Sequence, residues 1–337
     1  MPSRNQQHFF AILFMLLTGF IPAHAQPQPS IDTSYYVSYR HQLTTRIYLS
    51  QKYVHLNFPD GANGAELEYK ANTKLNLGAG FTWRALSVNI FYGFSALNTD
   101  QEKGATKGLD LQLNLYPRKW AVNLNAIFPK GYHLEPKGYA SNDPGGYYYR
   151  PDIKLNQLSL SAYRVPNKAR FSYRAALLQT EWQKRSAGSF LFGGNAYTGS
   201  AKGDSALVPK VLQGSFPEAG IEQIRFTGFG PGAGYAYTLV MGGHFFITGS
   251  LIANLNLCFT EEKTASGSVK KTDVSPTTNY KAAAGYNSSK WNVSANWTGN
   301  GIWFAGSAAK KDYFWPVGHY RVVIARRFDV SKKSHQH

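Results

Sequence analysis

The sequence has few of the features that stabilise a small secreted domain or an ordinary soluble one. Cys258 is the single cysteine among 337 residues, so no internal disulfide can form, whereas small secreted scaffolds carry several. Charged residues make up 16% of the chain, well below the roughly 25% of soluble domains. A disulfide scaffold is therefore excluded, and the composition argues against a fully water-exposed surface.

Acidic residues are scarcer than basic ones. Asp and Glu number 19 against 36 Lys and Arg, which leaves a formal net charge of +17. A basic balance can indicate nucleic-acid binding, but the secretion signal described next argues against that partner. We therefore expect no nucleic acid, and we expect anionic lipid headgroups, lipopolysaccharide or anionic solutes as partners.

Long hydrophobic runs are also missing. No stretch after residue 25 approaches the roughly 20 apolar residues of a spanning helix. Residues 1–25 read as a cleavable signal peptide, with Arg4 in a positive n-region, an apolar h-region over Phe9–Ile21 and a small-x-small site at 23–25. The alternative is a transmembrane anchor, which the short apolar run disfavours. A mature protein that enters a membrane must then be a closed barrel, because lipid leaves no other way to pair backbone polar groups.

Residues Gly108–Phe128 carry the clearest structural pattern. Leucines alternate with polar residues up to Leu115, and after Pro117 and Arg118 the alternation resumes from Trp120. A period of two indicates strands, and a two-residue turn indicates an antiparallel hairpin. In a soluble sheet the apolar face would pack on a core, whereas in a membrane barrel it would meet lipid and the polar face would line the lumen.

Similar strands recur along the chain, and short connections alternate with long ones. That alternation is typical of a bacterial outer-membrane barrel with short periplasmic turns and longer outer loops. We predict an all-β, transmembrane antiparallel up-and-down β-barrel of about 12 strands, with about ten or fourteen as alternatives. A soluble β-sandwich or lipocalin-like barrel is the competing fold.

The predicted organisation follows from these signals. We expect a signal peptide at 1–25, a periplasmic N-terminal lead at 26–40, the barrel at 41–328 and a periplasmic C-terminal tail at 329–337. The expected location is the outer membrane of a Gram-negative bacterium.

Four segments carry more specific predictions. Alternation of apolar and polar residues predicts a strand over 169–182, with its apolar side chains on one face. Residues 183–226 are predicted to form a large loop with its own hairpin, and 261–274 a charged loop. The Gly-rich stretch 228–234 leads into a strand and not a helix, so a bulge or barrel bend is expected there and not a phosphate loop.

Several short motifs resemble a known family. They are, in chain order, Asp32-Thr33-Ser34-Tyr35-Tyr36, Leu77-Gly78-Ala79-Gly80 after Asn72, Arg170-Phe171-Ser172-Tyr173-Arg174, Gln183–Phe190, Gly234-Tyr235-Ala236-Tyr237-Thr238 and Arg327-Phe328. Together they resemble an uncharacterised Bacteroidota outer-membrane family, domain-of-unknown-function family 4421, over about Asp32 to Phe328. The resemblance implies an outer-membrane β-barrel and brings no activity and no functional residues with it.

Charged residues are expected inside the barrel. By alternation, Arg170 and Arg174 in one strand and Arg321 and Arg327 in the last strand should point inward, with Asp110 as an acidic counterpart. A barrel of about 12 strands is too wide for small side chains to fill. The interior should hold either water, with a positive potential that attracts anions, or a ladder of interlocked charges that plugs it.

The closing strand, Gly318–Phe328, resembles the C-terminal strand that the barrel-assembly machinery reads. The candidate signal is the apolar face formed by Tyr320, Val322, Ile324 and Phe328. Arg326 departs from the pattern because it falls on that face, where its side chain is expected to snorkel to the interface. The alternative is an ordinary strand. We expect the assembly machinery as a partner during biogenesis, and a monomeric barrel.

No catalytic or metal-binding set stands out in the sequence. Known outer-membrane lipases and acyltransferases resemble one another in pairing His with a nearby Ser, and no histidine after residue 25 has Ser two residues on. No His, Cys or Asp cluster has metal-ligand spacing, and no cofactor is expected. Basic residues expected in loops, where lipopolysaccharide phosphates would favour them, are Lys184, Arg185, Lys270, Lys271, Lys310 and Lys311.

Three functional hypotheses remain open at this point. The first is an outer-membrane barrel that binds or slowly passes small anionic solutes. The second is a closed structural or adhesin-like barrel that acts through its long outer loops, and a plugged lumen would favour it. The third, a lipid-acting outer-membrane enzyme, requires Ser and His to meet at the barrel rim.

Overall fold

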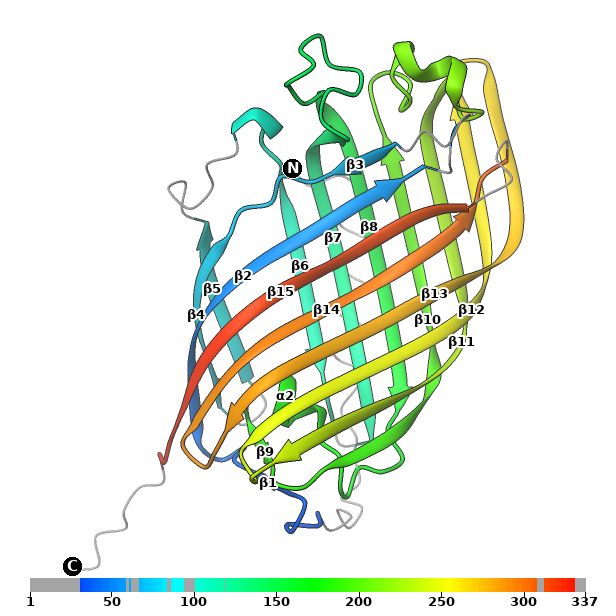
Figure 1. Cartoon of the computed structure of the whole chain (residues 1–337). Helices are drawn as coiled ribbons and strands as arrows, with labels where there is room; N and C mark the ends of the chain where they lie inside the picture. Colours follow the sequence, from blue (N-terminus) through cyan, green and yellow to red (C-terminus); the bar gives the residue numbers. More distant parts are fainter. Residues whose placement is uncertain are drawn as a thin grey trace, which may run out of the picture. The chain divides into compact units, whose positions relative to one another are not determined.

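The computed structural model describes residues 31–58, 61, 67–83, 86–93, 101–117, 119–307 and 312–330. The predicted signal peptide lies outside these residues. The elements (Figure 1) are β1 (Tyr36–Ser38), β2 (Leu43–Asn57), β3 (Glu68–Lys70), β4 (Asn76–Trp83), β5 (Leu86–Gly93), η3 (Gln101–Lys103), β6 (Lys107–Leu115), β7 (Trp120–Glu135), β8 (Tyr149–Arg164), α2 (Tyr173–Leu177), β9 (Glu181–Gln183), β10 (Ala187–Lys202), η4 (Lys210–Ser215), β11 (Ile221–Met241), β12 (Phe245–Thr264), β13 (Gly267–Asn287), β14 (Trp291–Ala305) and β15 (Asp312–Phe328).

Ten antiparallel strands form a ring closed by hydrogen bonds. Around the ring, the order is β2, β15, β14, β13, β12, β11, β10, β8, β7 and β3, and β3 pairs again with β2. Three further strands extend the sheet, since β4 pairs with β2, β5 with β4, and β6 with β7. In the described ranges β5 and β6 do not pair with each other. The predicted transmembrane antiparallel barrel is confirmed, and about 12 strands is close to the 13 of this sheet.

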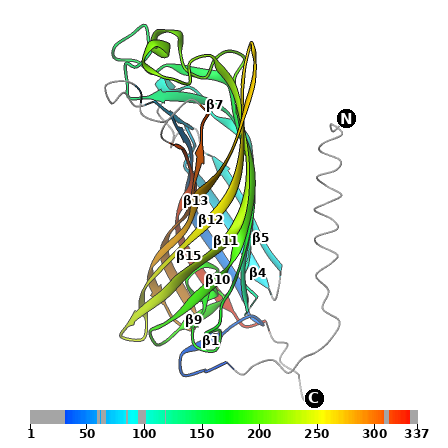
Figure 2. The ribbon, with the colours of Figure 1, turned by 90° about the vertical axis from the view of Figure 1, so that its right-hand side faces the viewer.

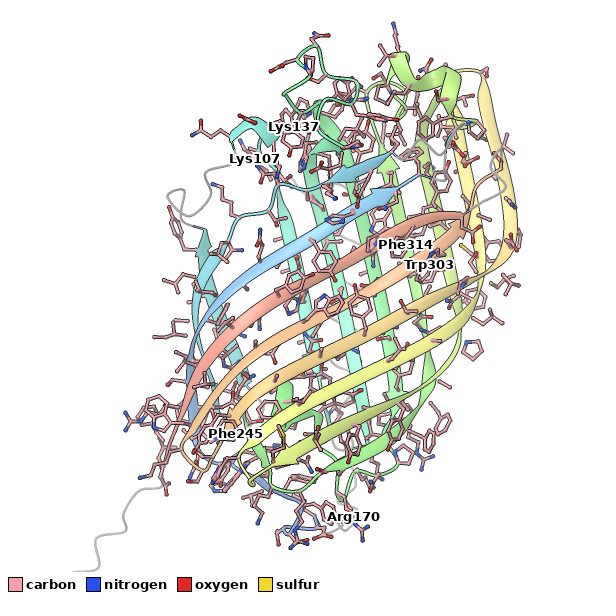
Figure 3. The ribbon with its side chains drawn as sticks, viewed as in Figure 1. Lys107, Lys137, Arg170, Phe245, Trp303 and Phe314 are labelled. Carbon is pink, nitrogen blue, oxygen red and sulfur yellow. The ribbon has the colours of Figure 1, made fainter. Side chains whose placement is uncertain are left out.

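Alternation along the strands gives the barrel wall an apolar outer face and a largely polar inner face. On β6, Leu109, Leu111 and Leu113 are exposed, while Gln112 and Asn114 line the interior. The same period of two leaves Phe245, Ile247, Leu251 and Leu255 exposed along β12. Figure 3 shows Phe245 near one end of the barrel and Lys107 near the other. This is the side-chain order expected when the outer face of a strand meets lipid.

The two ends of the barrel are built differently. At the end that we term the terminal end, β2 begins and β15 ends, and turns such as Gly242–His244 are short. At the opposite loop end, the longer connections 136–148 and 203–220 gather, as the two views in Figures 1 and 2 agree. Two connections break the alternation: 165–186 is long although it lies at the terminal end, and residues 265–266 alone join β12 to β13 at the loop end.

The predicted strand over 169–182 is wrong. This part of the chain forms a turn, helix α2 and the short strand β9. Ser172 is the N-cap of α2, and its hydroxyl accepts a 3.1 Å hydrogen bond from the backbone N–H of Ala175. Because Ala and Leu, which follow in the sequence, are strong helix formers, the local preference is helical although the apolar pattern has a period of two. None of the helices in the described ranges is long and apolar enough to cross a membrane.

Three further sequence predictions are also corrected. The segment 183–226 is not one large loop, because β10 pairs along its length with β8 and β11 as a strand of the barrel wall. The segment 261–274 is not a loop, because β12 and β13 continue their pairing up to Thr264 and Gly267. In the stretch 228–234 the register with β12 is the same on both sides of Gly230 and Pro231, which have no paired residue on β12, so there is no bulge, and the alternative of a barrel bend stays a prediction. The glycines of this stretch instead leave room for side chains: a Cβ on Gly232 would collide with the amide of Asn254.

Candidate functional site: the polar lumen between two closures

The loop end of the lumen is filled by a dry apolar core. Its centre is three buried aromatic side chains from different strands, Phe226, Phe304 and Trp315. The rings of Phe226 and Phe304 stack with centroids 4.1 Å apart, and Trp315 meets Phe226 edge-on at 5.1 Å. Because β11 and β14 are not neighbours in the sheet, this stack crosses the lumen. Further buried side chains around it include Leu56, Tyr69, Tyr132, Leu134, Ile153, Leu155, Leu207 and Tyr313.

Two carboxyl groups are buried at the edge of this core. Glu262 on β12 accepts a 2.7 Å hydrogen bond from the Tyr313 hydroxyl and a 2.9 Å bond from the Ser307 backbone N–H. Glu218, in the connection from η4 to β11, is fully buried, and neither of its carboxyl oxygens has a hydrogen-bond partner. Burial, and then the nearby charge of Glu262, raise the pKa of Glu218 to about 6. Ionisation of Glu218 would place an unpaired charge in an otherwise apolar region, and this costs free energy.

The terminal end of the lumen is closed by an inserted plug. We use the term plug for β1, α2, β9 and the residues that join α2 to β9; β1 and β9 pair as a two-stranded sheet of their own. The Tyr173 hydroxyl lies 2.6 Å from that of Ser250 on the barrel wall, and the Trp182 indole N–H donates a 2.9 Å bond to the Gly243 carbonyl. The plug is therefore bonded to its surroundings through side chains, and Figure 1 shows its elements α2, β1 and β9 at the terminal end.

Arg327 is the main polar connection between the plug and the wall. From β15 its guanidinium donates to the carbonyl of Gln179 at 2.9 and 2.6 Å, to the carbonyl of Glu181 at 3.1 Å and to the side-chain oxygen of Asn287 at 2.9 Å. Its carbon also lies 4.9 Å from the ring centre of Tyr39. The side chain is buried, so each of these bonds is made out of contact with water and would be costly to leave unmade.

A polar layer lies between the two closures. The Tyr163 hydroxyl donates a 2.7 Å bond to Asn254 and accepts a 3.0 Å bond from Asn279, which joins β8, β12 and β13 across the interior. Asn195 and Asn256 donate to the hydroxyl of Thr277 at 2.9 and 3.0 Å. Neutral amides and hydroxyls, which can both donate and accept, therefore fill most of this layer.

Lys281 is the cation at the centre of the polar layer. Its Nζ donates to the Tyr116 hydroxyl at 2.7 Å and to Asn123 Oδ1 at 2.6 Å, and it lies over the rings of Tyr116 and Tyr173. None of the described carboxylates pairs with it. A charge held only by neutral oxygens and aromatic faces is a place where a small anion would be stabilised.

Of the other charges on the inner face, Lys52 is paired with a carboxylate, whereas Arg321 and Arg46 contact an aromatic ring and neutral groups. Lys52 on β2 reaches Asp110 on β6 at 2.6 Å, so this pair spans two strands that are not neighbours. Arg321 lies over the ring of Tyr48 at 4.7 Å, and Arg46 donates to Asn89 at 3.2 Å. Because Asp110 is the one acid among the described inner-face residues of this layer, the interior keeps a positive balance.

A cavity of about 40 Å³ remains in the polar layer. It lies between β6 and β7 on one side and β13, β14 and β15 on the other, and its wall includes Lys281, His319 and the amides Gln112, Asn114, Asn123, Asn125, Asn279 and Asn300. A buried water needs roughly 10–15 Å³ measured in this way. The cavity therefore has room for a few waters or a small anion.

The structure places three of the five predicted lumen residues inside the barrel wall and the other two outside the strands of the wall. Arg321 and Asp110 lie on the inner face of the barrel, although Asp110 pairs with Lys52 and not with an arginine. Arg327 lies inside at the terminal end, where it binds the plug. The prediction for the other two is corrected, because the strand that carried them does not exist: Arg170 is exposed at the terminal end, 3.6 Å from Asp32, and Arg174 lies in the plug, 3.7 Å from Glu181.

Sequence reasoning missed Lys281, Arg46 and Lys52 as lumen charges. Arg46 and Lys52 share parity with the polar face of the predicted first strand, so alternation alone would have placed them inside. Lys281 follows the same rule on β13, but its face also includes Ala283 and Gly285, so the polar and apolar faces of this strand differ little in sequence. The signal was therefore present for two of the three residues.

The closing strand and the histidines have clear positions. Tyr320, Val322, Ile324 and Phe328 are all exposed on the outer face of β15, and Arg326 lies 5.0 Å from the ring centres of both Trp291 and Phe328. His319 lies within the lumen beside the Thr298 hydroxyl, at 3.1 Å. His244 stacks between Trp182 and Tyr286. Within the described ranges no group of His, Cys, Asp and Glu is arranged to hold a metal ion.

Comparison with known proteins adds a family and a set of distant barrels. The model of the family described as Domain of unknown function (DUF4421) matches residues 30–312. No curated protein matches the chain in sequence. Among solved structures, the outer membrane protease OmpT from Escherichia coli is 10% identical, with 86% of this chain and 97% of that chain covered and a TM-score of 0.35. The translocator domain of autotransporter NalP from Neisseria meningitidis is 9% identical, with 96% of each chain covered and a TM-score of 0.33. The Pseudomonas putida toluene transporter TodX is 7% identical, with 86% of this chain and 89% of that chain covered and a TM-score of 0.26. At these sequence identities and TM-scores, the solved structures assign no role to any residue of this protein and no activity to it.

Proposed function

The chain belongs to the DUF4421 family, and we propose that it is a closed outer-membrane β-barrel that acts through the surface displayed at its loop end. The loop end faces the cell exterior, and the terminal end faces the periplasm. The observation that carries the proposal is the aromatic stack of Phe226, Phe304 and Trp315 across the lumen. Side chains of the wall strands form this closure, so it cannot open without unpacking the wall itself.

The loop end has the extent needed for a binding surface. The connections 136–148 and 203–220 rise above the apolar core, and the β12–β13 hairpin extends to Thr264 and Gly267. Lys103 and Lys137 lie over the ring of Tyr147, at 5.1 and 5.4 Å, so the first of these connections contacts the 3-10 turn η3. Long loops on a rigid scaffold are a common site of binding function.

Conductance separates this proposal from passage of solutes. Full-length refolded protein in planar bilayers should give no steady current, and proteoliposomes should not swell in small anionic solutes. Faster gel migration without heating shows in each preparation that the barrel is folded. The variant Trp182→Ala, which loosens the plug, should also give no current because the loop-end core still closes the lumen. A steady current through the folded, unaltered protein would overturn the proposal.

A second candidate function, binding of a small anion in the lumen, is favoured by Lys281. Its Nζ has two neutral oxygens and two aromatic rings as partners and borders the 40 Å³ cavity. Phosphate or nitrate should then raise the thermal midpoint of the barrel, and Lys281→Met should abolish that rise. An equal rise in the variant would show that the anion acts elsewhere.

We also propose a non-enzymatic role, with outer-membrane lipids and lipopolysaccharide as partners, the barrel-assembly machinery as a partner in biogenesis, and a monomeric state. The support is indirect. The described histidines nearest to the candidate site have aromatic or threonine neighbours, and the apolar outer face has the alternation of a lipid-facing wall. Lipid hydrolysis by the purified, folded protein would contradict the first of these proposals.

A further inference from the structure

Four exposed lysines lie in register on four adjacent strands. Lys107 on β6 pairs with Lys130 on β7, Lys130 pairs with Lys154 on β8, and Lys154 pairs with Lys202 on β10. All four side chains are exposed. Because neighbouring strands are about 4.8 Å apart, the row spans about 14 Å. We refer to these residues as the lysine row.

The lysine row points outward, and on β6 and β7 it begins where the apolar outer face ends, whereas on β8 and β10 the polar pair Asn156 and Ser200 lies between the lysines and that face. The next outward pair toward the terminal end on β6 and β7 is Leu109 and Phe128, which are 56% and 39% exposed. On β8 and β10 the lysines share parity with the exposed residues Leu160 and Phe192. Figure 3 shows Lys107 at the loop end of β6. The row therefore starts at the level expected for lipid headgroups at the outer membrane surface.

The lysines of the row are not neutralised within the described residues. None of the four is in an ion pair, and Asp152, two residues from Lys154 on β8, is held by two 2.7 Å bonds from Arg150. Like charges placed directly opposite each other on neighbouring strands destabilise a sheet. A row of four such residues therefore calls for an anionic partner from outside the chain.

The other side of the loop end shows the opposite arrangement. There Arg225 on β11 pairs in register with Glu261 on β12, which pairs with Lys270 on β13. Arg225 reaches Glu261 at 3.5 Å, and Lys263 lies 3.8 Å from the same carboxylate. On these strands, which we term the alternating face, a carboxylate lies between basic residues, and Arg225 and Lys263 both contact it. The lysine row is thus a local feature of β6 to β10 and is not the general pattern of the barrel.

We propose that the lysine row binds the phosphate groups of an outer-leaflet lipid with a multiply phosphorylated headgroup, of the lipopolysaccharide type. The aliphatic stems of the lysines lie along the wall while their ammonium groups reach the headgroups, as lysines at membrane interfaces do. A row about 14 Å long is longer than one phosphate and matches a headgroup that carries several. The orientation of this row toward the outer leaflet rests on the proposed function, in which the loop end faces the exterior.

The basic residues that the sequence pointed to for this purpose lie elsewhere. Lys184 and Arg185 follow β9 at the terminal end, and their backbone N–H groups donate to the Tyr35 carbonyl. Lys271 lies 3.8 Å from Asp273. Lys310 and Lys311 lie outside the described residues. The lysine row was not singled out because its members are separated by up to 95 positions in the sequence and become neighbours only through strand pairing.

Two matched triple variants test the proposal. Lys130→Gln, Lys154→Gln and Lys202→Gln together remove three charges from the row, and Arg225→Gln, Lys263→Gln and Lys270→Gln remove three from the alternating face. Binding of lipopolysaccharide, of enzymatically dephosphorylated lipopolysaccharide and of phosphatidylglycerol to full-length protein in phosphatidylcholine nanodiscs is measured by native mass spectrometry. Heat-modifiable migration shows that each variant is folded.

Lipopolysaccharide affinity should fall on the order of 100-fold in the row variant, at about 1 kcal/mol for each basic residue near an anionic surface. The alternating-face variant should change it less than about threefold, because two of its three basic groups already contact the Glu261 carboxylate. Dephosphorylation should remove most of the binding, and phosphatidylglycerol, with one phosphate, should bind more weakly.

Equal losses in both variants, or unchanged affinity in the row variant, would overturn the proposal. So would tight binding of the dephosphorylated lipid, or of phosphatidylglycerol as tight as that of lipopolysaccharide. If the expected lipopolysaccharide affinities are found but the barrel passes a steady current, only the proposed closed-barrel function is contradicted. Failure of the lysine-row proposal and failure of the closed-barrel function can therefore be told apart.

Discussion

The lumen is closed twice, by two different kinds of interaction. At the loop end, wall strands direct aromatic side chains such as Phe226 and Trp315 into the interior, and the closure is apolar. At the terminal end, a separate segment is inserted and is held by directed hydrogen bonds from Arg327, Trp182 and Tyr173. The first closure is part of the wall, whereas the second belongs to a connection between two wall strands.

Because of this difference, the loop-end core should determine the stability of the whole barrel, whereas the plug should be able to move locally. Packing in the loop-end core contributes to the free energy of unfolding of the whole barrel, because the three rings at its centre belong to the long strands β11, β14 and β15. The plug contributes mainly through a small number of buried polar contacts, which can be lost locally. The two closures should therefore respond differently to substitutions of similar size.

The largest expected effect is on the loop-end core. Phe226→Ala removes the ring that stacks on Phe304 and meets Trp315 edge-on, and a buried Phe-to-Ala change costs about 3–5 kcal/mol. The measurement is the free energy of unfolding in a urea titration of refolded protein in lipid vesicles. Phe229→Ala is the control on the same strand, because Phe229 is exposed on the outer face. Equal costs for the two changes would show that the core does not support the barrel.

A smaller effect is expected at the terminal end. Arg327→Met keeps the aliphatic stem but removes the donors to the carbonyls of Gln179 and Glu181, and buried carbonyls left without a partner cost about 1–3 kcal/mol each. Because the plug can leave the lumen, we expect a net loss of about 2–3 kcal/mol and faster proteolysis within 165–186. Arg326→Met, on the outer face, is the control. Unchanged proteolysis in Arg327→Met would show that the plug is held by packing alone.

A pH dependence is expected from Glu218. Its pKa in the folded protein, about 6, lies above the ordinary value of 4.5. The stability that protonated Glu218 contributes is therefore fully present below pH 4.5 and is lost as the pH rises through 6. The difference is about 2 kcal/mol. Glu218→Gln should therefore stabilise the barrel at pH 8 and leave it nearly unchanged at pH 4. A variant no more stable than the unaltered protein at pH 8 would contradict this assignment.

The smallest effect is expected in the polar layer between the closures. Lys281→Met replaces a buried cation by an apolar side chain of similar length, and such replacements are often close to neutral when no buried charge is left unpaired. We expect a change of less than about 1 kcal/mol in the absence of anions. A loss comparable with that of Phe226→Ala would show that Lys281 organises the interior as a structural group.

The faces of the barrel were predictable because they depend on local sequence. The alternation in β6 places Leu113 outside and Asn114 inside without knowledge of any neighbour. The plug was not predictable in this way. Tyr173 and Arg174 alternate as a strand would, and their helical conformation depends on the Ser172 cap and on wall residues such as Asn287, far along the chain. The lysine row was not predictable for a related reason, since the register between neighbouring strands cannot be inferred from the sequence of any single strand.

The pairing of β2 with β15 has a consequence for how the barrel is made. This ladder runs from Leu43 opposite Phe328 to Asn57 opposite Phe314, so it joins the first and the last strand of the wall. Contacts between residues so distant in sequence form slowly, because a long segment of chain must be brought together before the pairing is favourable. The ring cannot close before β15 has been synthesised. Until then the edges of β2 and of the growing sheet are open to incorrect pairing, and the unfinished chain depends on being kept apart from other chains.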